Sequence, residues 1–157
     1  MMTEPLATIS PSPIRRAVAV LFLVFLGGML IYLAFVAPAR NLGWQALLLA
    51  FGGLCLYGAE QLRRATEYHI YLLDQNIVDS SGRELCRFDN IKGVERGAFA
   101  FKPSNGFLLR LKDPLPLAWA PGLWWRYGRR VGVGGVTPAS EAKFMAEFIA
   151  LRLAEQA

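Results

Sequence analysis

Residues 17–37 read AVAVLFLVFLGGMLIYLAFVA, a run without a single charged side chain. A helix rises about 1.5 Å per residue, so roughly 20 apolar residues cross a hydrocarbon core of about 30 Å. Residues 41–59, NLGWQALLLAFGGLCLYGA, form a second uncharged run directly afterwards. The pattern predicts two transmembrane helices, over about 17–37 and 42–59, which form an antiparallel hairpin within residues 14–64.

The first apolar run has an alternative interpretation as a secretory signal peptide. Arg15 and Arg16 resemble the positive n-region of such a peptide, and residues 37–39, Ala-Pro-Ala, resemble a cleavage site. However, the run is longer than the usual apolar region of about 7–15 residues, and a second span follows at once. We therefore expect a membrane hairpin that is not cleaved.

The distribution of arginines around the hairpin predicts its orientation. These residues are Arg15 and Arg16 before the first span and Arg63 and Arg64 after the second. The short loop between the spans carries one arginine, Arg40. Because positive charge accumulates on the cytoplasmic side of a membrane protein, we expect both termini in the cytoplasm.

Composition favours a membrane over a nucleic acid as the partner of this basic chain. Of the 157 residues, 54% are hydrophobic, and the net charge is +5. Much of the positive surplus is arginine beside the predicted spans or in one later cluster, so we expect contact with anionic headgroups and none with nucleic acid. The two cysteines, Cys55 at bilayer depth and Cys86 in a predicted strand, are unsuited to a disulfide, and no metal-ligand spacing is present.

Two glycine pairs are placed symmetrically in the hairpin. Gly27 and Gly28 precede the loop between the spans by about as many residues as Gly52 and Gly53 follow it, so the two pairs reach similar depth. Small residues allow the backbones of two transmembrane helices to approach each other. We expect these glycines to pack the hairpin, and a slot for a lipid or cofactor is the alternative.

After the hairpin, residues 65–157 contain short apolar stretches separated by turn residues, which is typical of strands in a meander. The candidate strands are residues 68–73, 77–79, 84–88, 91–101, 107–112 and 131–136. Asp113 and Pro114 are expected to end the strand at 107–112. At the other end of the chain, residues 1–13 contain three prolines and little periodicity, so we expect an irregular segment there.

The end of the chain has the pattern of an amphipathic helix. Thr137 and Pro138 supply an N-cap residue and a proline at the first helical position, and Glu141 adds an acid in the first turn. The apolar residues that fall on one face at helical spacing are Phe144, Met145, Phe148, Ile149 and Leu151. This spacing predicts a helix over residues 138–154 that buries this face.

A hairpin of two spans, then several strands, then one helix resembles the bacterial membrane-anchored PH-like (pleckstrin-homology-like) domain proteins. The resemblance rests on the strand series 68–112, on the stretch FDNIKGVE at 88–95, and on the helix 138–154. It implies an α+β domain over 65–157, in which two nearly orthogonal sheets make a partly open β-barrel capped by the C-terminal helix. It also implies a bacterial cytoplasmic (inner) membrane. Residues 114–128, rich in proline and tryptophan, depart from the family pattern.

Signals for enzymatic chemistry are weak. His69 is the one histidine in the sequence, and no Ser/His/Asp or Cys/His arrangement is recognisable. Gly132, Gly134 and Gly135 precede a helix, but they lack the full spacing of a nucleotide-binding loop. We expect no catalytic residue, metal or cofactor. An enzyme acting on a lipid or a nucleotide is a remote alternative, and its close-spaced candidate residues are Asp89, Glu95 and Arg96.

Residues 119–130 combine aromatic and basic side chains. The candidate interface residues are Trp119, Trp124, Trp125, Arg126, Tyr127, Arg129 and Arg130. Tryptophan and tyrosine favour the membrane–water interface, and each nearby arginine adds roughly 1 kcal/mol near anionic lipid. The same residue types also form hot spots in protein interfaces. Contact with lipid, contact with a protein, and burial of Trp124 and Trp125 in the core remain open.

These patterns predict a non-catalytic membrane-anchored interaction or assembly module, with the PH-like domain at the cytoplasmic membrane face. Its expected partners are anionic lipid headgroups and another membrane protein or complex. The alternative is an accessory subunit of a larger membrane complex, in which the hairpin packs against partner helices and the domain caps the assembly.

Overall fold

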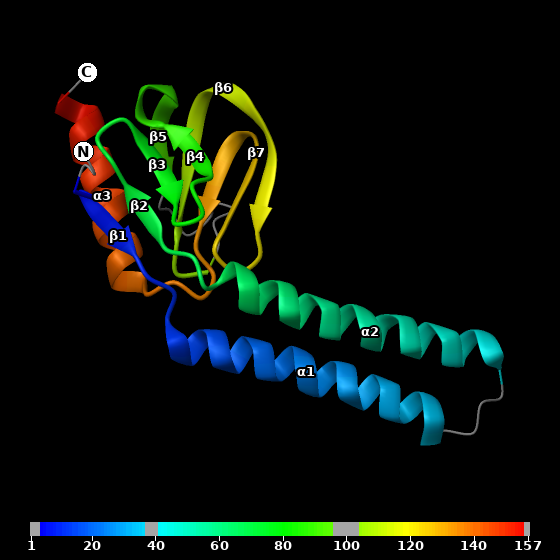
Figure 1. Ribbon diagram of the computed structural model, residues 1–157. Helices are drawn as coiled ribbons and strands as arrows, with labels where there is room; N and C mark the ends of the chain where they lie inside the picture. The colour runs from blue at the N-terminus through cyan, green and yellow to red at the C-terminus, as the bar shows by residue number, and fades with distance from the viewer. Residues whose placement is uncertain (1–3, 37–40, 96–103, 156–157) are drawn as a thin grey trace. The chain divides into compact units, whose positions relative to one another are not determined.

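The computed structural model describes residues 4–36, 41–95 and 104–155, and the chain divides into two compact units (Figure 1). One unit is the helical hairpin, Pro13–Arg64. The other unit contains Met1–Ser12 and Ala65–Ala157 and is called the sheet domain below. The sheet domain therefore takes its residues from both sides of the hairpin in the sequence.

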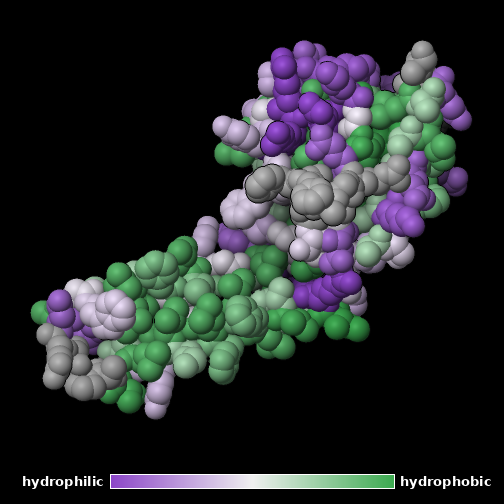
Figure 2. Space-filling view, turned by 180° about the vertical axis from the view of Figure 1, so that it is seen from behind, coloured by the Kyte–Doolittle hydropathy of each residue, from purple (hydrophilic) through white to green (hydrophobic). Residues whose placement is uncertain are grey.

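The hairpin consists of α1 (Pro13–Val36) and α2 (Leu42–Ala65). Each helix has 24 residues and is long and apolar enough to cross a membrane, as the sequence predicts. Most of the large apolar side chains on both helices are exposed, and Figure 2 shows an almost continuous hydrophobic surface over them. The side chain of Asn41 caps α2, because its Oδ1 accepts a hydrogen bond of 2.9 Å from the backbone N–H of Gly43.

The two helices are in close contact at a pair of glycines. A Cβ atom on Gly27 would lie 2.9 Å from the carbonyl oxygen of Gly52, and a Cβ on Gly52 would lie 2.6 Å from Cγ1 of Ile31. Nearer the loop, Nε2 of Gln45 donates a hydrogen bond of 3.0 Å to the carbonyl of Ala34. Small residues that allow close packing and interhelical hydrogen bonds both favour the association of helices in a membrane.

The sheet domain contains one four-stranded and one three-stranded antiparallel sheet. In spatial order, the first consists of β1 (Ala7–Ile9), β2 (Ile70–Leu72), β3 (Asn76–Asp79) and β4 (Glu84–Arg87). The second consists of β5 (Ile91–Glu95), β6 (Phe107–Ala120) and β7 (Trp124–Val133). A 3-10 turn, η1 (Phe88–Asn90), connects the sheets. The domain is α+β as expected, but its sheets are not closed into a barrel.

Strand β1 corrects the expectation that residues 1–13 are irregular. Its backbone pairs with β2, so that Ile9 lies opposite Ile70, and both side chains are fully buried. A three-residue strand shows too little alternation to stand out among prolines, and its partner strand lies far away in the sequence. The pairing has a topological consequence. The segment before α1 and the domain after α2 must lie on the same side of any membrane that the hairpin crosses.

Helix α3 (Ala139–Glu155) matches the predicted helix, and the expected core residues Met145 and Ile149 are fully buried, but the rest of its buried face differs from the prediction. Its buried residues are Ala142, Met145, Ala146 and Ile149. Of the expected core residues, Phe144 is 57% exposed and Leu151 is 67% exposed, while Phe148 is half-buried. The small side chains at 142 and 146 allow the helix to approach the sheets closely beside Met145 and Ile149, and Phe144 and Leu151 lie outside this contact.

Two polar contacts fasten the start of α3 to distant segments. The carboxylate of Glu141 accepts a hydrogen bond of 2.7 Å from the backbone N–H of Ser10, just after β1. The hydroxyl of Thr137 donates a hydrogen bond of 3.2 Å to the carbonyl of Asn105. Both residues carry the helix-start signal in the sequence. In the fold they also hold the N-terminal strand and the start of β6 against the helix.

The β6–β7 hairpin is long and folds back on itself, as Figure 1 shows. It bends where its register is interrupted, near Gly128, whose φ is 55°. The tip of the hairpin then reaches the residues that follow β7, and the N–H of Gly134 donates a hydrogen bond of 2.9 Å to the carbonyl of Leu123. The distal half, residues 115–128, is called the hairpin arm below.

The length of β6 corrects the strand end expected at Asp113 and Pro114. The strand continues to Ala120 and includes Pro114 and Pro116. Neither proline is paired with β7, because the register shifts between Arg110 and Leu115 and again before Ala118. Proline is tolerated at such irregularities, since no ladder hydrogen bond is lost there. The segment expected to depart from the family pattern is therefore part of the second sheet.

Candidate interaction surface

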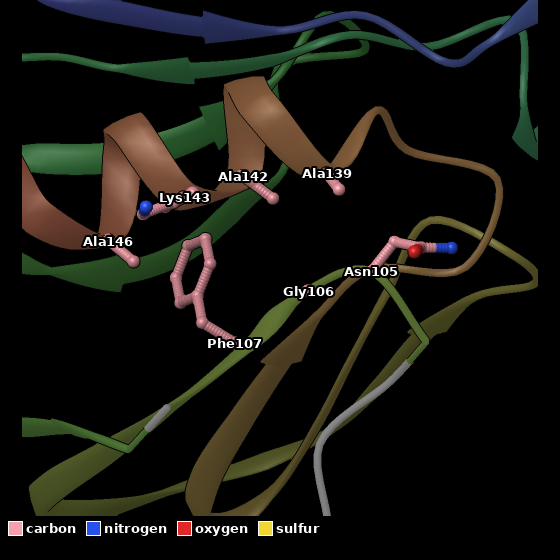
Figure 3. Close-up of a pocket in the computed structure, with 7 residues that line it drawn as sticks. All are labelled: Asn105, Gly106, Phe107, Ala139, Ala142, Lys143 and Ala146. Carbon is pink, nitrogen blue, oxygen red and sulfur yellow. The ribbon is translucent and has the colours of Figure 1, made fainter. Parts of the chain in front are cut away.

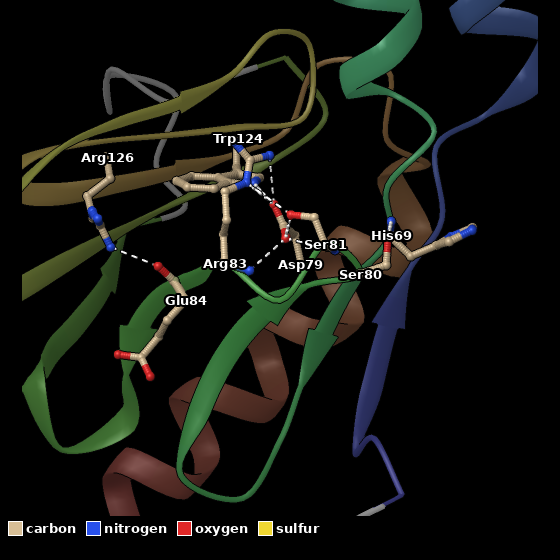
Figure 4. A network of polar contacts seen from close by, with 8 residues as sticks. All are labelled: His69, Asp79, Ser80, Ser81, Arg83, Glu84, Trp124 and Arg126. Carbon is tan, nitrogen blue, oxygen red and sulfur yellow. Dashed lines mark hydrogen bonds and ion pairs between the residues drawn. The ribbon is translucent and has the colours of Figure 1, made fainter.

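Trp124 belongs to the core of the sheet domain. Its side chain is 1% exposed, and its Nε1–H donates a hydrogen bond of 3.3 Å to Oδ2 of Asp79. The guanidinium carbon of Arg83 lies 5.4 Å from the centre of its ring (Figure 4). Trp124 is thus inaccessible to lipid or to a partner, which corrects its assignment to the interface. It pairs with the buried Ala120, and this face of the hairpin arm points inward.

Asp79 holds this network together from a fully buried position. Its Oδ1 accepts hydrogen bonds of 3.0 Å from the backbone N–H groups of Ser81 and Arg83, and another from the Ser81 hydroxyl. Nη2 of Arg83 lies 2.9 Å from Oδ2. A buried carboxylate is tolerated when it is paired and hydrogen-bonded in this way. Asp79 therefore fixes the turn after β3 and the indole of Trp124, which is a structural role.

Arg126 joins the hairpin arm to the first sheet. Its Nη1 donates hydrogen bonds of 2.8 Å and 3.0 Å to the carbonyls of Glu84 and Leu85 in β4. Its Nε donates a third, of 2.9 Å, to the carbonyl of Pro116. The side chain is half-buried and engaged in several directions. The guanidinium donates to backbone carbonyls at the unpaired edge of β4 and in the arm itself. It therefore braces the arm and is not free to bind a partner.

Trp125 is half-buried and covers Gly132. A Cβ at Gly132 would lie 2.4 Å from the indole of Trp125, so only glycine leaves room for the ring. This contact joins the two halves of β7 where the hairpin folds back. Gly132 therefore allows close packing against Trp125, which agrees with the lack of a nucleotide-binding motif in this glycine-rich segment.

Three large side chains of the hairpin arm are well exposed. They are Leu117 at 73%, Trp119 at 66% and Tyr127 at 69%, and together they are called the arm surface below. Sequence reasoning selected Trp119 and Tyr127 but not Leu117. The signal for Leu117 was present in the alternation of Leu115, Leu117 and Trp119, and it was missed because a strand end was expected before it.

Arg129 and Arg130 line a separate groove of about 490 Å³ on the three-stranded sheet. The lining residues of this basic groove are Lys92, Arg110, Leu111, Lys112, Arg129 and Arg130. The last two were predicted as interface residues, whereas the first four were not. They lie on other strands, and the strand register that brings them together cannot be seen as a sequence motif.

The four glycines of the hairpin divide into two roles. Gly27 and Gly52 lie in the contact between the helices. Gly28 and Gly53 have nothing within 4 Å of an added Cβ, so they face outward. Gly28 and Gly53 leave a surface without side chains on each helix, and Gly27 and Gly52 allow the two backbones to approach each other.

The described residues contain no group of three or more His, Cys, Asp or Glu that could hold a metal ion. Burial raises the pKa of Cys86 to about 12, which keeps this thiol protonated and unreactive. Nδ1 of His69 is buried and has no hydrogen-bond partner among the described residues. Figure 4 shows this side chain.

A cavity of about 560 Å³ lies between the start of β6 and α3 (Figure 3). Lys143 is the one ionisable side chain among its described lining residues, so the cavity offers no acid–base pair. The acids named for the enzymatic alternative are also apart. Asp89 precedes β5 and pairs with Arg87, Glu95 ends β5 and pairs with Arg110, and Arg96 lies outside the described residues.

Comparisons of the chain with protein-family models, with curated proteins and with solved structures give no match. Among the residues of the predicted interface and their neighbours, the exposed arm surface and the basic groove remain after the buried and bracing side chains are set aside.

Proposed function

We propose that the chain is a non-catalytic, membrane-anchored interaction or assembly module that binds another membrane protein through the arm surface. The exposure of Leu117, Trp119 and Tyr127 on one braced hairpin carries this proposal. Large aromatic side chains supply much of the binding energy in protein interfaces, particularly when they stand close together. The sheet domain resembles PH-like domains in its element order, and its place is the cytoplasmic face of a bacterial inner membrane.

The anchoring part of the proposal is supported by the pairing of β1 with β2. Because that sheet joins the residues before α1 to those after α2, the hairpin leaves and re-enters one side of the membrane. Arginines flank the spans on this side, which favours the cytoplasm. Cysteines introduced at Ser81 and Ser140, both exposed, should be shielded from an impermeant thiol reagent in intact cells. Labelling of either position from outside would contradict the orientation.

The bracing of the hairpin arm supports its use as a binding surface. Arg126 ties the arm to β4, and Trp124 is fixed by Asp79 and Arg83 on the opposite face. Side chains on a fixed backbone lose less conformational entropy on binding than those on a mobile loop. Trp124 and Arg126 are therefore not contact residues themselves, but they hold the side chains of the arm surface in place.

A second candidate function is that of an accessory subunit of a larger membrane complex. The observation that favours it is a separate apolar surface on α3, where Phe144 and Leu151 are exposed. A permanent subunit would cover this surface as well as the outward faces of the hairpin. Stoichiometric co-purification in mild detergent would favour the subunit, and recovery of the partner only after crosslinking would favour the transient module.

The matched exposed residues allow a controlled test of the arm surface. The full chain is crosslinked in native membranes and its adducts are identified by mass spectrometry. The double variant Trp119→Ser/Tyr127→Ser should lose the partner adduct, because it removes two exposed aromatic side chains without touching the core. The control Phe144→Ser/Leu151→Ser should keep it. Retention of the adduct by the first variant and its loss from the second would overturn the proposal and favour α3 as the contact.

A further inference from the structure

The basic groove is built from all three strands of the second sheet. Lys92 comes from β5, Arg110 and Lys112 come from β6, and Arg129 and Arg130 come from β7. Its volume of about 490 Å³ falls within the range of small-ligand sites. The groove is separate from the arm surface, so a role for it goes beyond the proposed function.

The charges around the groove are poorly balanced by the protein itself. Glu95 lies 3.3 Å from Arg110, and it is the one carboxylate of the described residues that forms an ion pair with a groove cation. Lys112 donates a hydrogen bond of 2.8 Å to a backbone carbonyl, that of Asp89. Five cationic side chains therefore line the groove, and one of them is ion-paired with a carboxylate, which favours a positive potential there.

The strand register places two of these cations directly opposite each other. Arg110 of β6 is the cross-strand partner of Arg130 of β7. Side chains at opposed positions have Cβ atoms about 4.5–5.5 Å apart, where like charges destabilise the sheet. An anion between the two guanidinium groups would turn this repulsion into two attractive contacts. This opposed pair is the observation that points most directly to a ligand.

Irregularities in the strands shape the two ends of the groove. The register shifts between Ile91 and Gly93, so Lys92 is the extra residue of a bulge. A second shift follows Arg110, which frees Lys112 from the regular ladder. Bulges re-aim side chains and are common beside binding sites. Here they accompany Lys92 of β5 and Lys112 of β6, which line the groove with the opposed arginines.

We propose that the basic groove binds a phosphate-bearing anion, held between Arg110 and Arg130 with Lys92 and Lys112 beside it. The planar fork of arginine donates two hydrogen bonds to phosphate oxygens, and lysine adds a compact positive charge. The phosphate group belongs either to the headgroup of an anionic lipid or to a soluble phosphate compound. The two sources share the same recognition chemistry and differ in the rest of the ligand.

The test uses the full chain, purified in an uncharged detergent, and calorimetric titration with two probes. The probes are inorganic phosphate and a short-chain phosphatidic acid kept below its micelle concentration. Saturable binding of one ligand per chain is expected, and the binding should weaken as salt rises from about 0.05 M to about 0.5 M. Tighter binding of the phosphatidic acid would identify a lipid headgroup as the source, and equal or tighter binding of inorganic phosphate would identify a soluble compound.

Two variants with equal charge change separate the groove from general electrostatics. Lys92→Gln/Arg130→Gln removes two groove cations and should weaken binding about tenfold or more, because charge-assisted hydrogen bonds are lost. Arg87→Gln/Lys143→Gln removes two exposed cations outside the groove and should leave binding within about twofold. In a Cys55→Ser background, protection of the buried Cys86 thiol from a maleimide verifies that each variant is folded.

Three results would overturn the proposal. The first is the absence of saturable binding for both probes. The second is an equal loss of affinity in the two charge-matched variants, since binding would then follow net charge. The third is binding of a single-stranded RNA or an acidic peptide at the groove with no binding of either phosphate probe. Loss of the partner adduct in the arm-surface variant is independent of all three, so the two proposals fail separately.

Discussion

Truncation of two tryptophans on the same hairpin arm should have very different effects on the stability of the sheet domain. Trp124 is 1% exposed and Trp119 is 66% exposed. Replacement of a buried tryptophan by alanine costs about 3–5 kcal/mol. Loss of the hydrogen bond to Asp79 adds roughly 1 kcal/mol. Trp124→Ala should therefore remove about 4–6 kcal/mol, which is a large share of the total stability of a domain of this size, whereas Trp119→Ala should change it by about 0.5 kcal/mol or less.

The buried thiol of Cys86 provides an assay for the full chain. Its side chain is fully buried in the sheet domain, and Cys55 in α2 is the other cysteine of the chain. In a Cys55→Ser background, brief exposure to a maleimide at increasing urea concentration reports the fraction of opened sheet domains. The midpoint of labelling for Trp124→Ala should fall to low urea, and that for Trp119→Ala should match the parent protein.

Two results would refute this account of the hairpin arm. One is an unchanged labelling midpoint in Trp124→Ala, which would mean that the indole is not part of the core. The other is an equal decrease in both variants, which would mean that Trp119 is packed against the domain. A large effect of Trp119→Ala would also remove the basis for the arm surface.

Three further predictions follow from individual contacts. The free energy of unfolding should fall by up to about 1.4 kcal/mol per pH unit above about pH 9. The reason is that the Cys86 thiol loses its proton there in the unfolded chain, while the folded thiol, with a pKa of about 12, keeps it. Urea titrations at several pH values should show this pH dependence, and Cys86→Ala should remove it. Gly52→Val should loosen the hairpin and slow its migration in detergent gels, while Gly53→Val should migrate as the parent does. Glu141→Ala should destabilise the sheet domain by about 1–3 kcal/mol in the same urea assay, because the Ser10 N–H loses its partly buried hydrogen-bond acceptor. An effect below about 0.5 kcal/mol would contradict this contact.

Features that depend on neighbouring residues could be predicted from the sequence. The apolar runs of α1 and α2, the cap signals before α3 and the turn residues between β2 and β4 are all local patterns. Their lengths and residue types predict the structure, because the residues that specify a helix or a turn lie within one short segment. The paired glycines were also informative, since Gly27 and Gly52 do meet.

Features that depend on tertiary packing were misread or missed. The periodicity of α3 showed an amphipathic helix, but close contact with the sheets favoured Ala142 and Ala146 over the bulkier Phe144 and Leu151. A three-residue strand such as β1 is recognisable only through its pairing with β2.

The cluster at 119–130 looked uniform in the sequence, yet alternation and the fold-back of the hairpin divide it. Trp124 enters the core, Arg126 braces β4, and Arg130 turns to the basic groove. Contiguity in the sequence does not place strand residues on one surface, because successive side chains point to opposite faces.

Site-specific photocrosslinking tests the central claim, that the arm surface binds a membrane protein. A photoreactive amino acid replaces Trp119 in the full chain, and the control replaces Lys143, which is exposed on α3. Irradiation of native membranes should give a discrete protein adduct from position 119 and none from position 143. Adducts with lipid alone at position 119, or the same protein adduct from both positions, would contradict the account.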